Sequence, residues 1–269
     1  MTKCLFGKRN SDFRSFTYES NHLNRALDEI LHPGGLQLTE RMANLARVGQ
    51  ERLVLDLACG RGSTSRFLAK RYDCHVIGLD LSRKSISIAD RRAKNQGQFH
   101  RVTFAVANAE HLPLKSETFD IVVSECSFSL LNNKKACARE INRVLKPNGI
   151  LALDDITHEE LSKQRELSDL QCPCFAGAES VEEYKNIFEQ VGFDLITFED
   201  HSMDLRRIAW QIIQAYGSLD NYWNSLNTMK RELDGVEKNT THSCRIPGSW
   251  CEHFSKIKPG YAIFIFEKK

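Results

Sequence analysis

The chain has 269 residues, of which 41% are hydrophobic and 27% are charged, so it is long enough to bury a substantial core in one large domain. The formal net charge is +2, and no run of five like charges indicates a nucleic-acid arm or a membrane-surface patch. Nine cysteines are an odd number for a disulfide framework and are scattered, which indicates reduced thiols.

The N-terminal stretch MTKCLFGKRNSDFRSF lacks the apolar core of a secretory signal. No apolar stretch of the sequence approaches the length of a membrane span. We therefore expect a cytoplasmic protein with neither a membrane nor a nucleic acid as partner. The sequence leaves the oligomeric state open.

Residues 1–50 are polar and predict a helical cap. Pro33 fixes φ while Gly34 and Gly35 permit positive φ, so residues 32–35 form a turn. A helix restarts near Leu36.

From residue 52 onward, short apolar runs alternate with amphipathic stretches, which is typical of parallel βαβ units. Ser63 and Ser82 stand where two helices begin, and Gly97 stands where the second of them ends. A further helix is predicted from about Lys134 to Leu145 and stops at the following Lys-Pro-Asn-Gly. The five predicted strands of this region are LVLDLA, CHVIGLD, VTFAVA, DIVVSE and ILALDDI.

The last third of the chain predicts a helix over residues 180–190, the strand FDLITFED, a helix over 203–233 and the final strand YAIFIFEKK. The stretch between these strands is longer than an ordinary connection and predicts a helical lid. The fold class is therefore α/β, with a seven-stranded, mostly parallel sheet, helices on both faces and the lid inserted before the last strand. The expected parts are a cap at 1–50, a core at 51–201, the lid at 202–259 and the last core strand at 260–269.

A glycine-rich turn follows the first predicted strand, in LVLDLACGRGS. Gly60 and Gly62 let the backbone approach a ligand, and the helix that follows offers unpaired N–H groups. The third glycine of the dinucleotide fingerprint is missing, which argues against a pyrophosphate-containing cofactor. Asp80, at the end of the second strand, can accept hydrogen bonds from both hydroxyls of a ribose. Asn108 and Ala109 follow the third strand, where an adenine edge would be read.

The motifs DLACGRG, GLDLS, NAEHLPL, FDIVVSE and REINRVLKPNGILALDDI resemble, in order and spacing, those of class I S-adenosylmethionine-dependent methyltransferases. The resemblance covers about residues 36–200 and implies a Rossmann-like fold with S-adenosylmethionine as cofactor. In that family the first loop holds the methionine part, the acidic residue after the second strand holds the ribose, and the residues after the third strand hold the adenine. The matching residues are Asp56, Ala58, Cys59, Gly60 and Gly62, then Asp80 with Leu81, then Asn108 with Ala109. Asn108 stands where an Asp is usual, and its amide oxygen can still accept a hydrogen bond.

Gly34 and Gly35 have two interpretations. They can form an ordinary helix break. Alternatively, the loop HPGG can close over the methionine end of the cofactor, as loops before the first strand often do in methyltransferases.

Cys126 follows the fourth strand and Cys174 follows the fifth, so the two can meet above the cofactor's methyl group. Thiolates are soft ligands that could hold a thiophilic acceptor such as trivalent arsenic. The surrounding segments resemble the substrate-binding half of arsenite methyltransferases, where two cysteines at these positions bind the arsenic. In this chain Glu125 replaces the expected Asn, Cys4 alone represents an upstream cysteine set, and Cys172 could substitute for a third thiolate. The alternative is that these are ordinary buried thiols.

A tail segment carries an HxC and a CxH pair, His242 with Cys244 and Cys251 with His253. Cys and His are the usual ligands of zinc, but this spacing matches no common zinc module, so we expect no metal cofactor. The alternative to a zinc site is that these residues belong to the lid, with Cys244 or Cys251 facing the substrate.

Methyl transfer from a sulfonium mainly requires alignment of the acceptor and exclusion of water. Cys126, Cys174 and Glu125 are the catalytic candidates. Glu125 would act as general base for a carbon or oxygen acid, or would contact the cofactor or lid. Three functions remain open: methylation of a small thiophilic acceptor, methylation of an organic metabolite such as a quinone-like or carboxylic compound, and non-catalytic binding of the cofactor or a metalloid.

Overall fold

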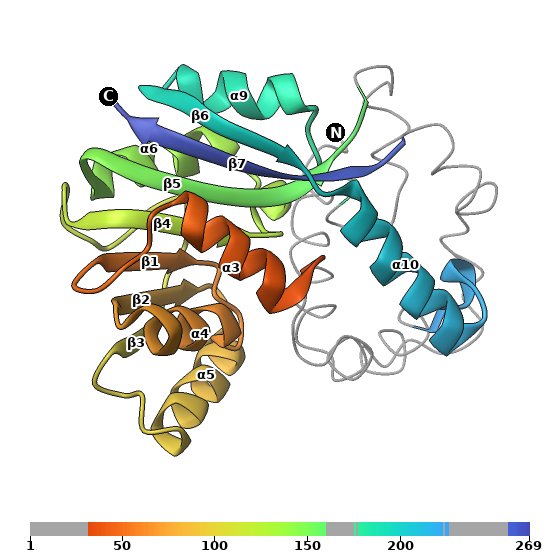
Figure 1. Ribbon diagram of the computed structural model, residues 1–269, viewed down its shortest axis with the longest axis horizontal. Coiled ribbons are helices and arrows are strands. Elements are labelled where there is room, and N and C mark those ends of the chain that lie inside the picture. Colours follow the sequence, from red (N-terminus) through yellow and green to blue (C-terminus); the bar gives the residue numbers. More distant parts are fainter. Residues whose placement is uncertain (1–31, 160–174, 176, 223, 226–257) are drawn as a thin grey trace, which may run out of the picture.

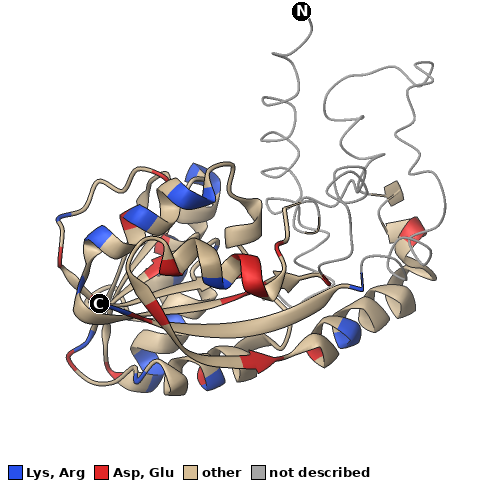
Figure 2. Cartoon of the chain, turned by 90° about the horizontal axis from the view of Figure 1, so that it is seen from above, with Lys and Arg blue, Asp and Glu red and all other residues tan. Residues whose placement is uncertain are grey.

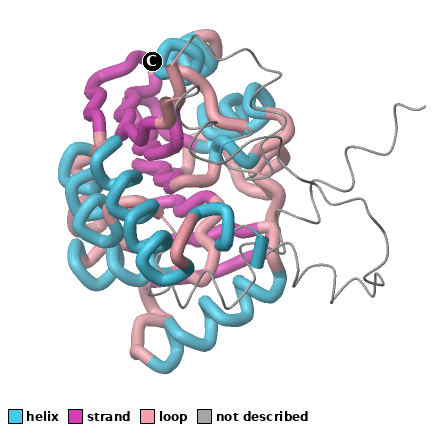
Figure 3. The backbone as a smooth tube through the Cα atoms, turned by 90° about the vertical axis from the view of Figure 1, so that its right-hand side faces the viewer, coloured by secondary structure: helices cyan, strands magenta, loops and turns pink. Residues whose placement is uncertain are grey.

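The computed structural model describes residues 32–159, 175, 177–222, 224–225 and 258–269. One sheet of seven strands forms the central layer, with helices on either side (Figures 1 and 3). The strands are β1 (Leu53–Leu57), β2 (His75–Asp80), β3 (Val102–Val106), β4 (Phe119–Glu125), β5 (Leu145–Thr157), β6 (Phe193–Asp200) and β7 (Gly260–Lys268). The helices are α3 (Gly35–Leu45), α4 (Ser63–Tyr72), α5 (Arg83–Asn95), η1 (Phe128–Leu130), α6 (Lys134–Val144), α9 (Val181–Glu189) and α10 (Ser202–Tyr216).

The strand order is β3-β2-β1-β4-β5-β7-β6. Strands β1 to β5 pair in parallel, and β7 runs antiparallel to both β5 and β6. All seven predicted strands and the mostly parallel Rossmann-like sheet are therefore confirmed. Because the chain order reverses between β1 and β4, their carboxyl ends border the crevice in which open α/β sheets bind ligands.

Each face of the sheet packs against its own apolar cluster. Helices α3, α4, α5 and α10 cover one face, where Met42, Leu68 and Ile86 pack on the strands. Helices α6 and α9 cover the other, where Ile141 and Phe188 are fully buried. Strands that are buried on both faces have nearly continuous apolar sequences, and this is why the strands could be predicted from the sequence.

The predicted helix boundaries are partly wrong. Ser82 caps α5 by accepting a hydrogen bond from the Ser85 N–H, as predicted, and Gly97 follows the end of that helix. Ser63, however, is the first residue of α4 rather than its cap, because Gly62 takes the cap position with φ 73°.

α6 spans Lys134–Val144, as predicted to within one residue. β5, however, begins earlier than predicted: Leu145 already pairs with Phe119, so the Lys-Pro-Asn-Gly segment lies within the strand at a register shift. One further helix ends earlier than predicted. α10 ends at Tyr216 because Gly217, at φ 81°, is in the left-handed region. Residues 226–233 of the predicted long helix lie outside the described residues, as do residues 1–31 of the predicted cap and most of the predicted lid.

Basic and acidic residues are interspersed over the described elements (Figure 2). No helix in the described part of the chain is long and apolar enough to cross a membrane.

Candidate active site

A pocket of about 310 Å³ opens at the carboxyl ends of β1, β2 and β4. It lies at the reversal of strand order, where the fold predicts ligand binding. Ten residues singled out by the sequence line it: Asp56, Ala58, Cys59, Gly60, Asp80, Leu81, Asn108, Ala109, Glu125 and Cys126.

The Asp80 carboxylate is held in place by backbone. One oxygen accepts a hydrogen bond from the Gly60 N–H at 2.8 Å, and the other accepts one from the Ser82 N–H at 2.8 Å. This clamp joins the β1–α4 turn to the end of β2. Asp80 lines the pocket, and a carboxylate is a suitable acceptor for the hydroxyls of a ribose.

The two glycines of the first loop have different roles. A Cβ on Gly60 would meet no atom within 4 Å, whereas a Cβ on Gly62 would lie 2.5 Å from Cζ of Phe104. Gly60 therefore keeps pocket space open, and Gly62, which is not among the lining residues, allows α4 to pack against β3. Gly78 has the same packing role, since its Cβ would lie 2.6 Å from the Phe104 ring. This role of Gly78 was not predicted from the sequence, because a glycine inside a strand carries no ligand signal.

Asn108 lines the pocket, but its side-chain oxygen accepts a hydrogen bond from the Glu110 N–H at 2.9 Å. This oxygen, which the sequence analysis assigned to an adenine amino group, thus supports the turn after β3. Leu81 is 67% exposed at the pocket rim, an apolar surface of the kind on which a purine can lie.

The carboxylate of Glu125, at the end of β4, contacts side chains from other elements. Its carboxylate accepts a 2.7 Å hydrogen bond from the Thr39 hydroxyl of α3 and another from the Thr64 hydroxyl of α4. His32 Nε2 lies 3.6 Å from Oε2 of Glu125, and both side chains are buried. Glu125 therefore ties the segment before β1 to the core.

That segment reaches the pocket through His32 rather than through its glycines. His32 is among the lining residues, while Gly34 and Gly35 are not. A Cβ on Gly34 would lie 2.6 Å from Cβ of Leu38, so this glycine serves the tight start of α3. Thr39 and Thr64 could not be predicted as partners of Glu125, because contacts between residues 86 and 61 positions apart leave no local pattern. In the HPGG loop the sequence pointed to the glycines rather than to His32.

Three aspartates of the central strands, Asp56 of β1 and Asp154 and Asp155 of β5, are buried. Burial raises the pKa of Asp56 to about 7 and that of Asp155 to about 6. It also raises the pKa of Asp154 well above its ordinary value. Asp56 lines the pocket and accepts a 2.5 Å hydrogen bond from the Ser65 hydroxyl. When ionised, Asp56 supplies a negative charge suited to a cationic sulfonium.

Cys126 occupies an unusual backbone position. Its φ is 47°, and its N–H donates to the Asp154 carbonyl at 2.9 Å and to Oδ1 of the Asp154 side chain at 3.1 Å. The residue is buried and lines the pocket, next to Glu125. A second lining thiol, Cys59, has its pKa raised well above the ordinary value by burial. Cys4, Cys172, Cys174 and the tail residues His242, Cys244, Cys251 and His253 lie outside the described residues.

The methyltransferase domain family matches residues 50–192, more than half of the chain, and the chain belongs to this family. With its sheet order and its Asp80 clamp, it is an S-adenosylmethionine-dependent methyltransferase.

Among relatives, the chain is 29% identical to a sarcosine/dimethylglycine N-methyltransferase of Halorhodospira halochloris, with 77% of each chain covered. It is also 29% identical to an uncharacterized protein of Haemophilus influenzae, covering 79% of this chain and 87% of the other. A phosphoethanolamine N-methyltransferase of Triticum aestivum is 28% identical over 77% of this chain, but the match spans only 36% of that longer protein.

Solved structures share the fold. The [4+2]-cyclase SpnF superposes with a TM-score of 0.73 at 20% identity, with 96% of each chain covered. A phosphoethanolamine N-methyltransferase 2 of Haemonchus contortus, in complex with S-adenosyl-L-methionine, gives a TM-score of 0.67 at 20% identity, covering 95% of this chain and 60% of the other.

Proposed function

We propose that this enzyme methylates the nitrogen of a small amine, which binds at the end of the pocket formed by His32, Glu125 and Cys126. The observation that carries the proposal is the position of this end. This end lies at the carboxyl end of β4, and the Asp80 carboxylate, which suits the ribose, lies at the end of β2. Strands β2 and β4 flank β1 on opposite sides, so the acceptor and the ribose would occupy different parts of the pocket.

The relatives support the amine class. One relative, at 29% identity, is named for sarcosine and dimethylglycine, and another, at 28% identity, is named for phosphoethanolamine; all three are nitrogen acceptors. An amine bound in its neutral form attacks the methyl carbon with its lone pair, the sulfur–carbon bond breaks and the sulfonium becomes a thioether. The acceptor releases its ammonium proton to solvent before it binds, so the transfer step itself needs no base. Glu125, already engaged by Thr39 and Thr64, then acts by positioning the amine.

Asp56 fits this chemistry as an electrostatic partner of the cofactor. Its carboxyl group lies at the floor of the pocket, is 2% exposed and belongs to β1, whose end the cofactor loop follows. A carboxylate in a poorly solvated site stabilises a cation more than it would in water.

A thiophilic acceptor is the second candidate, favoured by the buried Cys126 at the same end of the pocket. A thiolate could bind trivalent arsenic there, and Cys174 would supply a second thiolate.

Transfer of label from methyl-labelled S-adenosylmethionine separates the two candidates. The panel holds glycine, sarcosine, dimethylglycine, ethanolamine and phosphoethanolamine on one side and arsenite with glutathione on the other. We expect label in an amine, with Cys126→Ser retaining most of the turnover. Label in arsenite alone, abolished by Cys126→Ser, would establish the second candidate instead, and label in neither group would refute both.

A further inference from the structure

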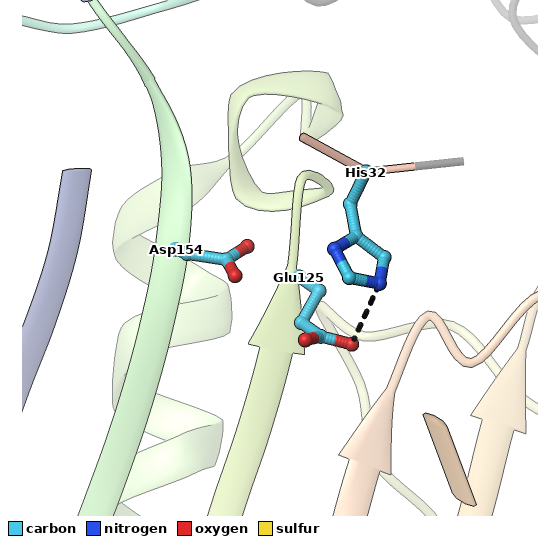
Figure 4. Close-up of side chains that lie close together, drawn as sticks. All are labelled: His32, Glu125 and Asp154. Carbon is cyan, nitrogen blue, oxygen red and sulfur yellow. Dashed lines mark ion pairs between the residues drawn. The ribbon is translucent and has the colours of Figure 1, made fainter. Parts of the chain in front are cut away.

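Three potential metal ligands from separate parts of the chain converge at the end of the pocket. His32 comes from the segment before α3, Glu125 from the end of β4 and Asp154 from β5 (Figure 4). One imidazole nitrogen and one oxygen of each carboxyl group all lie within 4.8 Å of one another. Figure 4 shows the Asp154 carboxyl group directed toward the other two side chains.

Asp154 has one oxygen that the described protein groups do not satisfy. Its Oδ1 accepts hydrogen bonds from the Tyr261 hydroxyl at 2.6 Å and from the Cys126 N–H. Its Oδ2 is buried and accepts no hydrogen bond from any group in the described part of the chain. The whole residue is 0% exposed. A buried carboxylate oxygen without a hydrogen-bond donor costs free energy. A bound cation or a proton on Oδ2 would remove this cost.

The neighbouring Asp155 is an equally buried acid, but both of its carboxylate oxygens accept hydrogen bonds. It is also 0% exposed, but its Oδ2 accepts a 2.8 Å hydrogen bond from the Ser129 N–H and its Oδ1 accepts one from the Ile156 N–H at 2.7 Å. Successive residues of a strand point to opposite faces of the sheet, so Asp155 is directed away from His32 and Glu125. Burial alone therefore does not leave an acid unmatched in this strand.

We propose that His32, Glu125 and Asp154 bind a divalent cation. Carboxylates suit Mn²⁺ and imidazole suits Fe²⁺ and Zn²⁺, so a set of one imidazole and two carboxylates can bind a divalent transition-metal ion. The 3.6 Å separation of His32 Nε2 from Oε2 of Glu125 matches two ligands on one ion. Two carboxylates balance the charge of the cation, so it adds no net positive charge beside a sulfonium. This assignment departs from the sequence analysis, which expects no metal.

The cation site also indicates which chemical group the acceptor carries besides its amine, and this step rests on the proposed function. Three protein ligands leave at least one coordination position open. Because His32 and Glu125 line the pocket, that position is available to a carboxylate or phosphate oxygen of the amine acceptor. The enzyme would then select amines that carry an anionic group.

The test is titration of the chelator-treated full chain with Mn²⁺, followed by electron paramagnetic resonance, with neither cofactor nor acceptor present. We expect about one bound Mn²⁺ per chain and at least tenfold weaker binding in Asp154→Asn and in His32→Ala. Asp155→Asn is the matched control and keeps wild-type binding. Melting temperatures identify any variant that fails to fold, and His32→Ala, at the edge of the core, carries the test if Asp154→Asn does not fold.

Absence of Mn²⁺ binding to the wild-type chain, or equal binding by His32→Ala, would overturn the cation site while leaving amine methylation untouched. If the cation binds but ethanolamine is methylated as well as phosphoethanolamine and sarcosine, the cation site stands and the selection of anionic acceptors is wrong.

Discussion

The two ends of the pocket are built in different ways. At the cofactor end, Asp80 is fixed by the N–H groups of Gly60 and Ser82, which lie 20 and 2 residues away in the chain. At the acceptor end, Glu125 is fixed by the side chains of Thr39 and Thr64, which lie 86 and 61 residues away. The position of Asp80 therefore depends on backbone groups, whereas the position of Glu125 depends on the side chains of two residues distant in the chain.

The largest expected effect tests the cofactor end. Asp80→Ala removes the carboxylate that the Gly60 and Ser82 N–H groups hold and that would bind the ribose. Because hydrogen bonds to a charged group contribute about 1.5–3 kcal/mol each, we expect cofactor affinity to fall at least ~100-fold by isothermal titration calorimetry. Asp73→Ala, which removes a half-exposed acid paired with Arg101, is the control and should bind the cofactor normally. An unchanged affinity in Asp80→Ala would place the ribose elsewhere.

The second prediction tests the acceptor end. Glu125→Ala leaves the Thr39 and Thr64 hydroxyls and His32 without their buried acceptor, and we expect a loss of about 3 kcal/mol in the free energy of unfolding. Urea denaturation measures it.

A matched pair exists in Arg41 and Glu199, which also join α3 to the sheet. The Arg41 side chain is 53% exposed, and an exposed pair contributes about 0–1 kcal/mol. Glu199→Ala should therefore cost far less than Glu125→Ala. Equal costs would mean that burial of the Glu125 cluster adds nothing to stability.

The third prediction separates the two glycines of the cofactor loop. Gly62→Ala places a methyl group 2.5 Å from Phe104 at φ 73°, and we expect a loss of about 2 kcal/mol in stability. Gly60→Ala meets no atom within 4 Å, so it should cost about 1 kcal/mol for the positive φ alone and act mainly on cofactor affinity. Thermal melts with and without S-adenosylmethionine measure both effects. A larger stability loss for Gly60→Ala than for Gly62→Ala would contradict this division.

The difference between the two ends also explains how much the sequence could predict. The strands, the Asp80 position and the loop glycines follow from apolar runs and short spacings, and the fold inferred from them is correct. The packing role of Gly62 was hidden, because it depends on Phe104 from a strand 42 residues later. His32, Thr39 and Asp154 were also hidden, because hydroxyls and single acids become informative only when the sheet brings β4, β5 and α3 together.

The smallest expected effect concerns Asp56, which lies between the two ends on β1. Its pKa is raised from 3.8 to about 7, first by burial, against the Ser65 hydrogen bond, and further by the nearby carboxylates of Glu125 and Asp80. The folded state therefore binds the proton more tightly than the unfolded state does. The free energy of unfolding should fall as the pH rises from about 4 to about 7 and level off above that.

Between pH 6 and pH 7.5 this loss amounts to about 1 kcal/mol. Other groups titrate in the same range, so the measurement is the difference in urea stability between the wild type and Asp56→Asn, which keeps an acceptor for the Ser65 hydroxyl. The wild type should lose about 1 kcal/mol relative to the variant over this interval. Binding of S-adenosylmethionine should reduce the loss, because a sulfonium near Asp56 favours its ionised form and lowers its pKa. Parallel stability curves for the two chains would show that Asp56 does not titrate between pH 6 and pH 7.5, and would contradict the raised pKa of this carboxyl group.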